Sequence, residues 1–196
     1  MEREAEIELA RELLAGNPGA FDRLVESLHS RLLHYSLMVC GQRDDAEEVA
    51  QDTLLKVFES LDQLREPEHV RAWVFRIARN ACLMKRRKSV FAPARELSLE
   101  ELTPATQISD GGERPDKRAL RKELRGAIEE AIQELPEIYK TVLLLRDVQE
   151  LSTRETARVL EVNEDVVKTR LHRARLAVRQ KLDAYLPEAR RGANSL

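Results

Sequence analysis

The sequence predicts an all-α protein made of two small helical domains joined by a flexible linker. Apolar residues recur at helical spacing through most of the 196-residue chain. This pattern stops between residues 89 and 117, where three prolines and a Gly-Gly pair interrupt it. We therefore place one domain at 1–88 and a second at 118–186, followed by a frayed tail at 187–196.

Charge is distributed unevenly along the chain, although the formal net charge is only −2. Residues 1–66 hold 7 Lys/Arg and 15 Asp/Glu, a net charge of −8, whereas residues 68–88 have a net charge of +6 and residues 163–182 of +4. An acidic front with two separate cationic helices indicates two DNA contacts and another kind of partner.

Several classes of protein are disfavoured by the composition. No apolar run approaches the ~20 residues of a membrane span, and the acidic start is unlike a secretory leader, so we expect no membrane insertion and a cytoplasmic protein. Cys40 and Cys82 lack zinc-type spacing and are interpreted as buried reduced thiols, with a redox pair left open. The four histidines form no nucleophile or metal constellation, so we expect no catalytic residue, metal, cofactor or enzyme activity.

The first domain is predicted to begin with three helices. Residues 2–15 form a short helix, and residues 20–39 a longer one that ends at Gly41, a favoured C-terminal cap. A third helix is predicted to begin at Asp44 with a D-x-x-E capping box to Glu47.

The third helix has an acidic outer side. Its inner face carries Ala46, Ala50, Leu54, Val57 and Leu61, and its outer face carries Glu48, Gln51, Asp52, Leu55 and Glu59. A leucine surrounded by acids would suit protein docking, but single exposed apolar residues are also ordinary, and the pattern alone favours that second interpretation.

A fourth helix is predicted from Pro67 to about Lys88. Its buried face is expected to hold Val70, Val74, Ile77 and Ala81. Its other side carries Arg71, Phe75, Arg76, Arg79, Cys82, Arg86 and Arg87. An aromatic ring among cations is typical of a surface on which unstacked bases lie on rings. Alternatively, Phe75 and Trp73 pack against neighbouring helices, which we favour for Trp73.

The linker is long enough to let the two domains reach separate sites. A random coil of about 29 residues spans roughly 30 Å on average, and roughly 95 Å when extended. Two DNA elements about 16 base pairs apart are separated by roughly 55 Å. The linker can therefore bridge them.

The second domain is predicted to end in a helix-turn-helix over residues 151–182. Ser152 and Glu155 form a capping box for its first helix, and Asn163 caps its second. In the second helix Val167, Leu171, Ala174 and Val178 form one apolar face. The opposite face carries Asp165, Lys168, Thr169, His172 and Arg173, with Arg170 and Arg175 on the flanks.

Charges of one sign distinguish this helix from a solvated surface helix. From Lys168 to Lys181 there are six Lys/Arg and no acid, whereas a solvated helix usually mixes signs in i,i+4 pairs. The pattern favours a recognition helix that enters a DNA major groove.

Three stretches resemble the sigma factors of bacterial RNA polymerase, specifically the extracytoplasmic-function (ECF) group of the sigma-70 family. DDAEEVAQDTLLKVFESL resembles the core-binding segment of region 2, and VRAWVFRIARNACLMKRRK the segment that melts and reads the −10 element. The stretch from LPEIYKT to RQKL resembles region 4, which reads the −35 element. The resemblance implies a helical region 2 domain and a region 4 unit of four helices, without catalysis.

The resemblance also implies partners and residue roles. Core RNA polymerase would contact Glu48, Gln51, Asp52 and Leu55. The resemblance thus favours protein docking at this face, whereas the pattern alone favoured an ordinary exposed leucine. The −10 element would lie along Arg71, Phe75, Arg76, Arg79, Asn80 and Arg86, with the loop 64–69 holding an extruded base. The −35 element would be contacted by Lys168, Thr169, Arg170, His172, Arg173 and Arg175. An anti-sigma factor is implied as regulator.

Some positions depart from the family pattern. Glu161 stands where the turn usually has Gly, at a cost of ~1 kcal/mol if its φ is positive. Thr156 replaces a branched apolar residue, and His172 leaves the promoter sequence undetermined. Two alternatives stay open: a sigma mimic that sequesters an anti-sigma factor, and a simple helix-turn-helix repressor. The first would lack the cationic surfaces, and the second would leave residues 44–88 unexplained.

Overall fold

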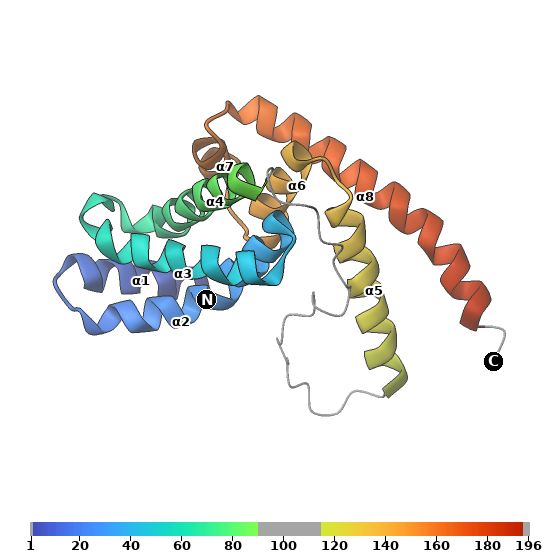
Figure 1. Ribbon diagram of the computed structural model, residues 1–196, viewed down its shortest axis with the longest axis horizontal. Helices are drawn as coiled ribbons and strands as arrows, with labels where there is room; N and C mark the ends of the chain where they lie inside the picture. The colour runs from blue at the N-terminus through green and yellow to red at the C-terminus, as the bar shows by residue number, and fades with distance from the viewer. Residues whose placement is uncertain (1, 90–114, 194–196) are drawn as a thin grey trace.

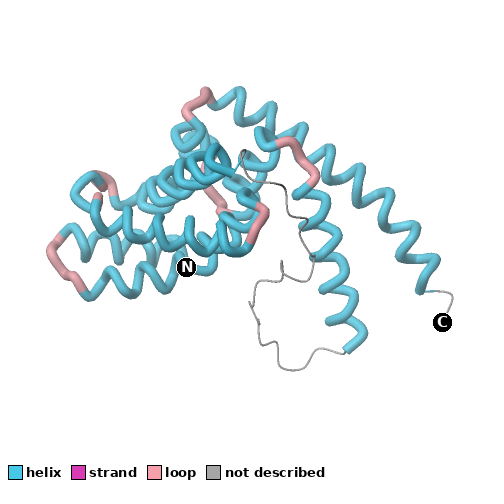
Figure 2. Tube along the Cα trace, in the orientation of Figure 1, coloured by secondary structure: helices cyan, strands magenta, loops and turns pink. Residues whose placement is uncertain are grey.

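The computed structural model describes residues 2–89 and 115–193, with side chains over 2–87 and 121–183. All regular secondary structure in these ranges is helical (Figures 1 and 2), which confirms the predicted fold class. Most of the predicted linker lies outside the described residues, although residues 115–117 already belong to a helix. The described chain consists of a front half before this gap and a back half after it.

The front half is built around the second helix. It consists of α1 (Glu2–Leu14), α2 (Gly19–Cys40), α3 (Arg43–Glu59), 3-10 turns at Leu61–Gln63 and Pro67–His69, and α4 (Val70–Ser89). Helix α2 contacts α1, α3 and α4 (Figure 1). Its buried stripe includes Leu24, Leu28 and Leu32. Gly41 ends the helix with φ of 84° and donates its N–H to the Leu37 carbonyl, as predicted.

The start of α3 differs from the prediction. Gln42, not Asp44, occupies the N-cap position, and no side chain caps this end of the helix. Asp44 instead lies in the first turn, where its negative charge interacts favourably with the helix dipole without bonding a backbone N–H. The predicted capping box is therefore wrong, while the helix itself is present.

The back half consists of a helix pair beside a helix-turn-helix. It contains α5 (Pro115–Gln133), α6 (Glu137–Leu143), a π-helical turn at Leu144–Val148, α7 (Thr153–Leu160) and α8 (Glu164–Ala193). Helix α5 lies alongside the long α8 (Figure 1). The tail, predicted to fray from residue 187, is helical to Ala193. Pro187 lies inside this helix and cannot donate a backbone N–H to the ladder, whereas residues 188–191 are strong helix formers.

The local signals of the helix-turn-helix are confirmed. The Ser152 hydroxyl accepts the Glu155 N–H at 3.1 Å, and the Glu155 carboxylate accepts the Ser152 N–H at 2.7 Å. Glu161 ends α7 in the left-handed region with φ of 58°. The Asn163 side chain then accepts the Val166 N–H at 2.8 Å to begin α8.

Helix α4 is buried on more sides than its periodicity predicted. Phe75 is 0% exposed and packs edge-on against Tyr35, with ring centroids 5.3 Å apart. Cys82 is also 0% exposed, and Trp73 is buried as favoured. The expected outward orientation of Phe75 is therefore wrong, because α2 covers that side of α4 while α3 and α7 cover others.

Arg71 also differs from the prediction, which placed it on the exposed side of this helix. It is 1% exposed, and its guanidinium forms a bidentate pair with the buried Glu6 carboxylate at 2.6 and 2.8 Å. Helix α1 supplies that carboxylate from 65 residues upstream. Arg71 is therefore part of the protein interior and does not present a cation to solvent.

The two halves share one core. Their buried side chains form a continuous apolar cluster, which includes Val74 of α4 and Val159 of α7. Helix α7 lies against α4 (Figure 1). The described structure is therefore a closed arrangement of the two halves.

Candidate nucleic-acid interface

The outer face of α8 is an exposed cationic surface of the back half. Lys168, Thr169, His172 and Arg173 are all exposed, while Val167, Leu171 and Ala174 are buried beneath them. The Lys168 ammonium lies 3.0 Å from Asp165, a contact that raises the pKa of Lys168. This face therefore combines cations with hydroxyl and imidazole donors, which suits contacts to base edges.

The two flanking arginines have different surroundings. Arg175 makes bidentate hydrogen bonds of 2.8 and 2.6 Å to Asp147, which raise its pKa. Arg170 is half-buried and, together with Arg79, lines a cavity of about 90 Å³ between the two halves. Both lie next to the exposed face.

Helix α4 offers a smaller cationic surface. Arg76 and Asn80 are exposed, one turn apart on the same face. Arg79 is partly buried and approaches the Val159 carbonyl of α7 at 3.5 Å, and Arg86 pairs with Glu137 of α6 at 2.5 Å. Two of the predicted cations of α4 are thus engaged by the back half.

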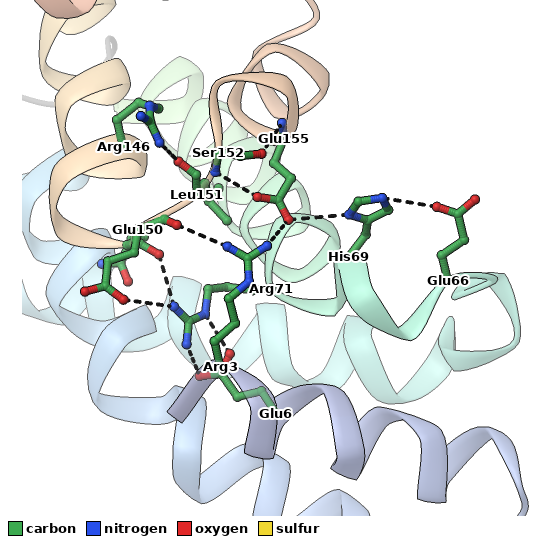
Figure 3. Close-up of polar contacts among 11 residues, drawn as sticks. Arg3, Glu6, Glu66, His69, Arg71, Arg146, Glu150, Leu151, Ser152 and Glu155 are labelled. Carbon is green, nitrogen blue, oxygen red and sulfur yellow. Dashed lines mark hydrogen bonds and ion pairs between the residues drawn. The ribbon is translucent and has the colours of Figure 1, made fainter. Parts of the chain in front are cut away.

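A cluster of polar contacts joins α1, α4 and the helix-turn-helix (Figure 3). Arg71 reaches the Gln149 carbonyl at 3.3 Å and the Glu150 carboxylate at 3.6 Å. Arg3 donates to the Glu150 carbonyl at 3.3 Å and also pairs with Glu155. Glu150, like Glu161, has φ of 58°, so these contacts hold a strained turn.

His69 extends this cluster to the loop before α4. Its ring lies 3.4 Å from Glu155 and 3.2 Å from Glu66 (Figure 3). Burial opposes ionisation of Glu155, but hydrogen bonds from Ser152 and the charge of Arg3 leave its pKa below the usual value. The carboxylate that caps α7 therefore also holds the loop of the front half.

That loop lines a groove at the contact of the two halves. Leu64, His69, Trp73 and Arg76 form one side of a space of about 190 Å³, and Glu155, Arg158 and Val159 of α7 form the other. The loop expected to hold an extruded base is thus covered by the helix-turn-helix in this arrangement.

The acidic face of α3 lies as predicted. Glu48, Gln51 and Asp52 are exposed, and Leu55 is 58% exposed. Sequence analysis missed that this face continues across α4, where Met84 is 62% exposed. The two helices enclose a groove of about 460 Å³, lined by Asp52, Leu55, Lys56, Ile77, Met84 and Lys85, among others. Met84 could have indicated this continuation, because it follows Asn80 by one helical turn and therefore lies on the same face of α4.

Among the described residues, the His, Cys, Asp and Glu side chains contain no group of three or more that could hold a metal ion. None of the described helices combines the length and apolarity needed to cross a bilayer.

Two helical halves, each with an exposed cationic helix face, define a DNA-binding protein, and comparison with known proteins specifies its family. The model of sigma-70 region 2 matches residues 24–90, and that of sigma-70 region 4 matches residues 125–178. The ECF sigma factor SigM of Mycobacterium tuberculosis is 30% identical over 87% of this chain and 81% of its own length. SigW of Bacillus subtilis is 28% identical over 88% of this chain and 94% of its own length.

Solved structures share the fold. CnrH in complex with the cytosolic domain of CnrY matches with a TM-score of 0.63 and 25% identity, over 92% of this chain and 98% of its own. The sigma factor RpoE of Bartonella quintana, in complex with the anti-sigma factor NepR, matches with a TM-score of 0.66 and 20% identity, over 83% and 96%. The chain belongs to the ECF sigma factors of the sigma-70 family.

Proposed function

We propose that the chain binds core RNA polymerase in the cytoplasm, directs it to promoters by reading −10 and −35 elements, and helps to open the DNA. The observation that carries this proposal is the presence in one chain of two separate cationic helix faces, on α4 and α8, and a groove between α3 and α4 beside the acidic face of α3. We assign the chain no catalytic step, because nucleotidyl transfer belongs to the polymerase.

The exposed face of α8 would enter the major groove of the −35 element. Lys168, Thr169, His172 and Arg173 would face base edges, where a bidentate arginine contact discriminates by ~1–3 kcal/mol. Arg170 and Arg175 would contact phosphates, which position the helix without specifying sequence. Their places on the flanks of the exposed face support this division.

The exposed side of α4 would lie along the −10 element. Arg76 and Asn80 are available directly, whereas Arg79 and Arg86 become available when the halves separate. The loop 64–69 would hold an extruded base, and binding of that base would offset an unpairing cost of a few kcal/mol. Arg71 and Phe75 are assigned structural roles because they are buried.

The groove between α3 and α4 would bind core polymerase. Its exposed apolar side chains, Leu55 and Met84, lie among the acids Glu48 and Asp52, with Gln51 beside them. Such a mixture of apolar surface and charge suits a protein partner.

Promoter binding would require the closed arrangement to open. Helix α7 lies against the loop 64–69, and Arg79 and Arg86 contact the back half, so these groups would reach the −10 element only after the halves separate. Two similar structures were solved as complexes, one with the cytosolic domain of CnrY and one with the anti-sigma factor NepR. We infer that an anti-sigma factor controls this chain too.

The proposal is tested by transcription in vitro from a promoter library with purified core polymerase. We expect selected start sites to share two upstream elements, and Arg173→Ala to lose the −35 preference. Arg179→Ala is the matched control, since Arg179 is an exposed cation farther along α8. A folded chain that fails to co-purify with core would favour the sigma mimic. A dimer that binds a palindrome without polymerase would favour a repressor.

A further inference from the structure

Two thiols from different helices meet where α2 packs against α4. Cys40 is the last residue of α2, Cys82 lies in the middle of α4, and their Sγ atoms are 3.2 Å apart. Both are free thiols. Cys82 is 0% exposed, whereas Cys40 is only partly buried. Cys40 is therefore the more accessible residue of the pair to a small oxidant.

The surroundings of the pair distinguish the two thiols chemically. A hydrogen bond with Cys82 lowers the pKa of Cys40, and the charges of Arg86 and Lys85 act in the same direction, against burial and Asp45. The same hydrogen bond and burial raise the pKa of Cys82. Cys40 is thus the more acidic thiol of the pair, and Cys82 is the less acidic one. Thiolate character together with access determines which cysteine reacts.

We propose that Cys40 and Cys82 form a peroxide-reactive dithiol, with Cys40 as the attacking thiol and Cys82 as the resolving thiol. In the first step the Cys40 thiolate attacks one oxygen of hydrogen peroxide, and the O–O bond breaks. Cys40 becomes a sulfenic acid, and the departing hydroxide takes a proton to leave as water. In the second step Cys82 gives up its proton as its sulfur attacks the Cys40 sulfur, the S–O bond breaks, and the departing hydroxide takes that proton to leave as a second water. The dithiol is oxidised to a disulfide, and the peroxide is reduced to two waters.

The disulfide would tie the end of α2 to α4. It would link residues 42 positions apart, and closing a loop of that length restricts the unfolded chain. The disulfide would leave the exposed side of α4 unchanged, because Arg76 and Asn80 are exposed whereas Cys82 is buried. The expected consequence is a reversible gain in thermal stability, with Tm higher by roughly 5–10 °C.

The test treats the full-length reduced protein with hydrogen peroxide and maps the modified peptides by mass spectrometry. We expect the peptides containing Cys40 and Cys82 to become linked with the loss of two hydrogens, and dithiothreitol to reverse the link. Met84 is mapped separately, because its exposed sulfur can gain an oxygen independently. The proposal is overturned if Cys40 accumulates oxygen while Cys82 stays alkylatable after unfolding, or if both thiols remain free.

Two variants assign the roles of the thiols. Cys40→Ser should leave Cys82 unmodified by peroxide, because Cys82 is shielded. Cys82→Ala should convert Cys40 to the irreversible sulfinic acid, because no resolving thiol is present. If Cys82 instead reacts in Cys40→Ser as fast as the wild-type pair, the assigned order of attack is wrong. Circular dichroism checks that each variant is folded. The peptide mapping of the wild-type protein tests the proposal even if a variant does not fold.

Discussion

Helices α4 and α8 are both rich in cations, but they hold them differently. On α8, Lys168 and Arg173 extend from one exposed face above a buried apolar stripe. On α4, Arg71 is buried against Glu6, and Arg86 pairs with Glu137 of the other half. The same residue type therefore supports the interior in one helix and faces solvent in the other. Sequence charge alone does not distinguish an arginine that binds DNA from one that holds the fold together.

The largest expected effect concerns the buried cation of α4. Arg71→Ala should lower the free energy of unfolding by about 3–5 kcal/mol, because it leaves the Glu6 carboxylate buried without its partner. Urea unfolding measures this loss. The matched control is Arg76→Ala, an exposed cation on the same helix, which should change stability by no more than about 0.5 kcal/mol. Equal losses in the two variants would contradict the assigned roles.

The opposite behaviour is expected on α8. Arg173→Ala should leave stability within about 0.5 kcal/mol of wild type, because Arg173 is exposed and its contact with the Tyr139 hydroxyl is long, at 3.4 Å. Transcription that depends on the −35 element should fall by about 10- to 100-fold, since a base contact is worth ~1–3 kcal/mol. Runoff transcription with core polymerase measures the fall. If Arg179→Ala caused the same loss, the effect would be one of general charge.

A third prediction concerns the polar cluster between the helices. Glu155→Gln should keep the capping box, because Gln also accepts from the Ser152 N–H, but it loses the charge that faces Arg3 and His69. We expect a loss of about 1 kcal/mol at neutral pH.

The pH dependence of this loss follows from the pKa of Glu155. Although burial raises it, hydrogen bonds with Ser152 leave it below the value of 4.5 expected for a free glutamate. A lowered folded-state pKa gives stability that is present above 4.5 and is lost as the pH falls through the folded value. The gap between wild type and Glu155→Gln in urea unfolding should therefore close in acid. A gap that stays constant down to the acid range would show that the charge of Glu155 is not involved.

The smallest effect is expected at the turn before α8. Glu161→Gly should stabilise the protein by about 0.5–1 kcal/mol, since Gly adopts the left-handed conformation without steric cost. Glu150 has the same φ of 58°, but its carboxylate also lies 3.6 Å from Arg71. Glu150→Gly should therefore gain less than Glu161→Gly. Differential scanning calorimetry compares the two, and a larger gain at Glu150 would mean that its contact with Arg71 contributes nothing.

The sequence predicted best what depends on local geometry. The capping box of Ser152 and the side-chain cap of Asn163 involve residues within a few positions of each other. Helix α8 was also predicted well, because its amphipathic pattern corresponds to burial on one side. Periodicity is reliable for a helix at the edge of a bundle.

Tertiary contacts explain the errors on α4. Periodicity assumes one buried face, whereas α4 contacts α1, α2, α3 and α7. No local pattern indicates that Arg71 meets a carboxylate 65 residues away, or that Phe75 meets Tyr35. The contact between the two halves was not predicted for the same reason, since its partners, such as Arg86 and Glu137, lie on opposite sides of the linker.

The central claim is that α4 and α8 read two different promoter elements. It is tested most directly by crossing Arg76→Ala and Arg173→Ala with promoters mutated in one element at a time, and measuring transcription by core polymerase. We predict that Arg173→Ala loses its response to changes in the −35 element and keeps its response to the −10 element, while Arg76→Ala does the reverse. Two variants that lose their response to the same element, or that both respond like wild type, would contradict the claim.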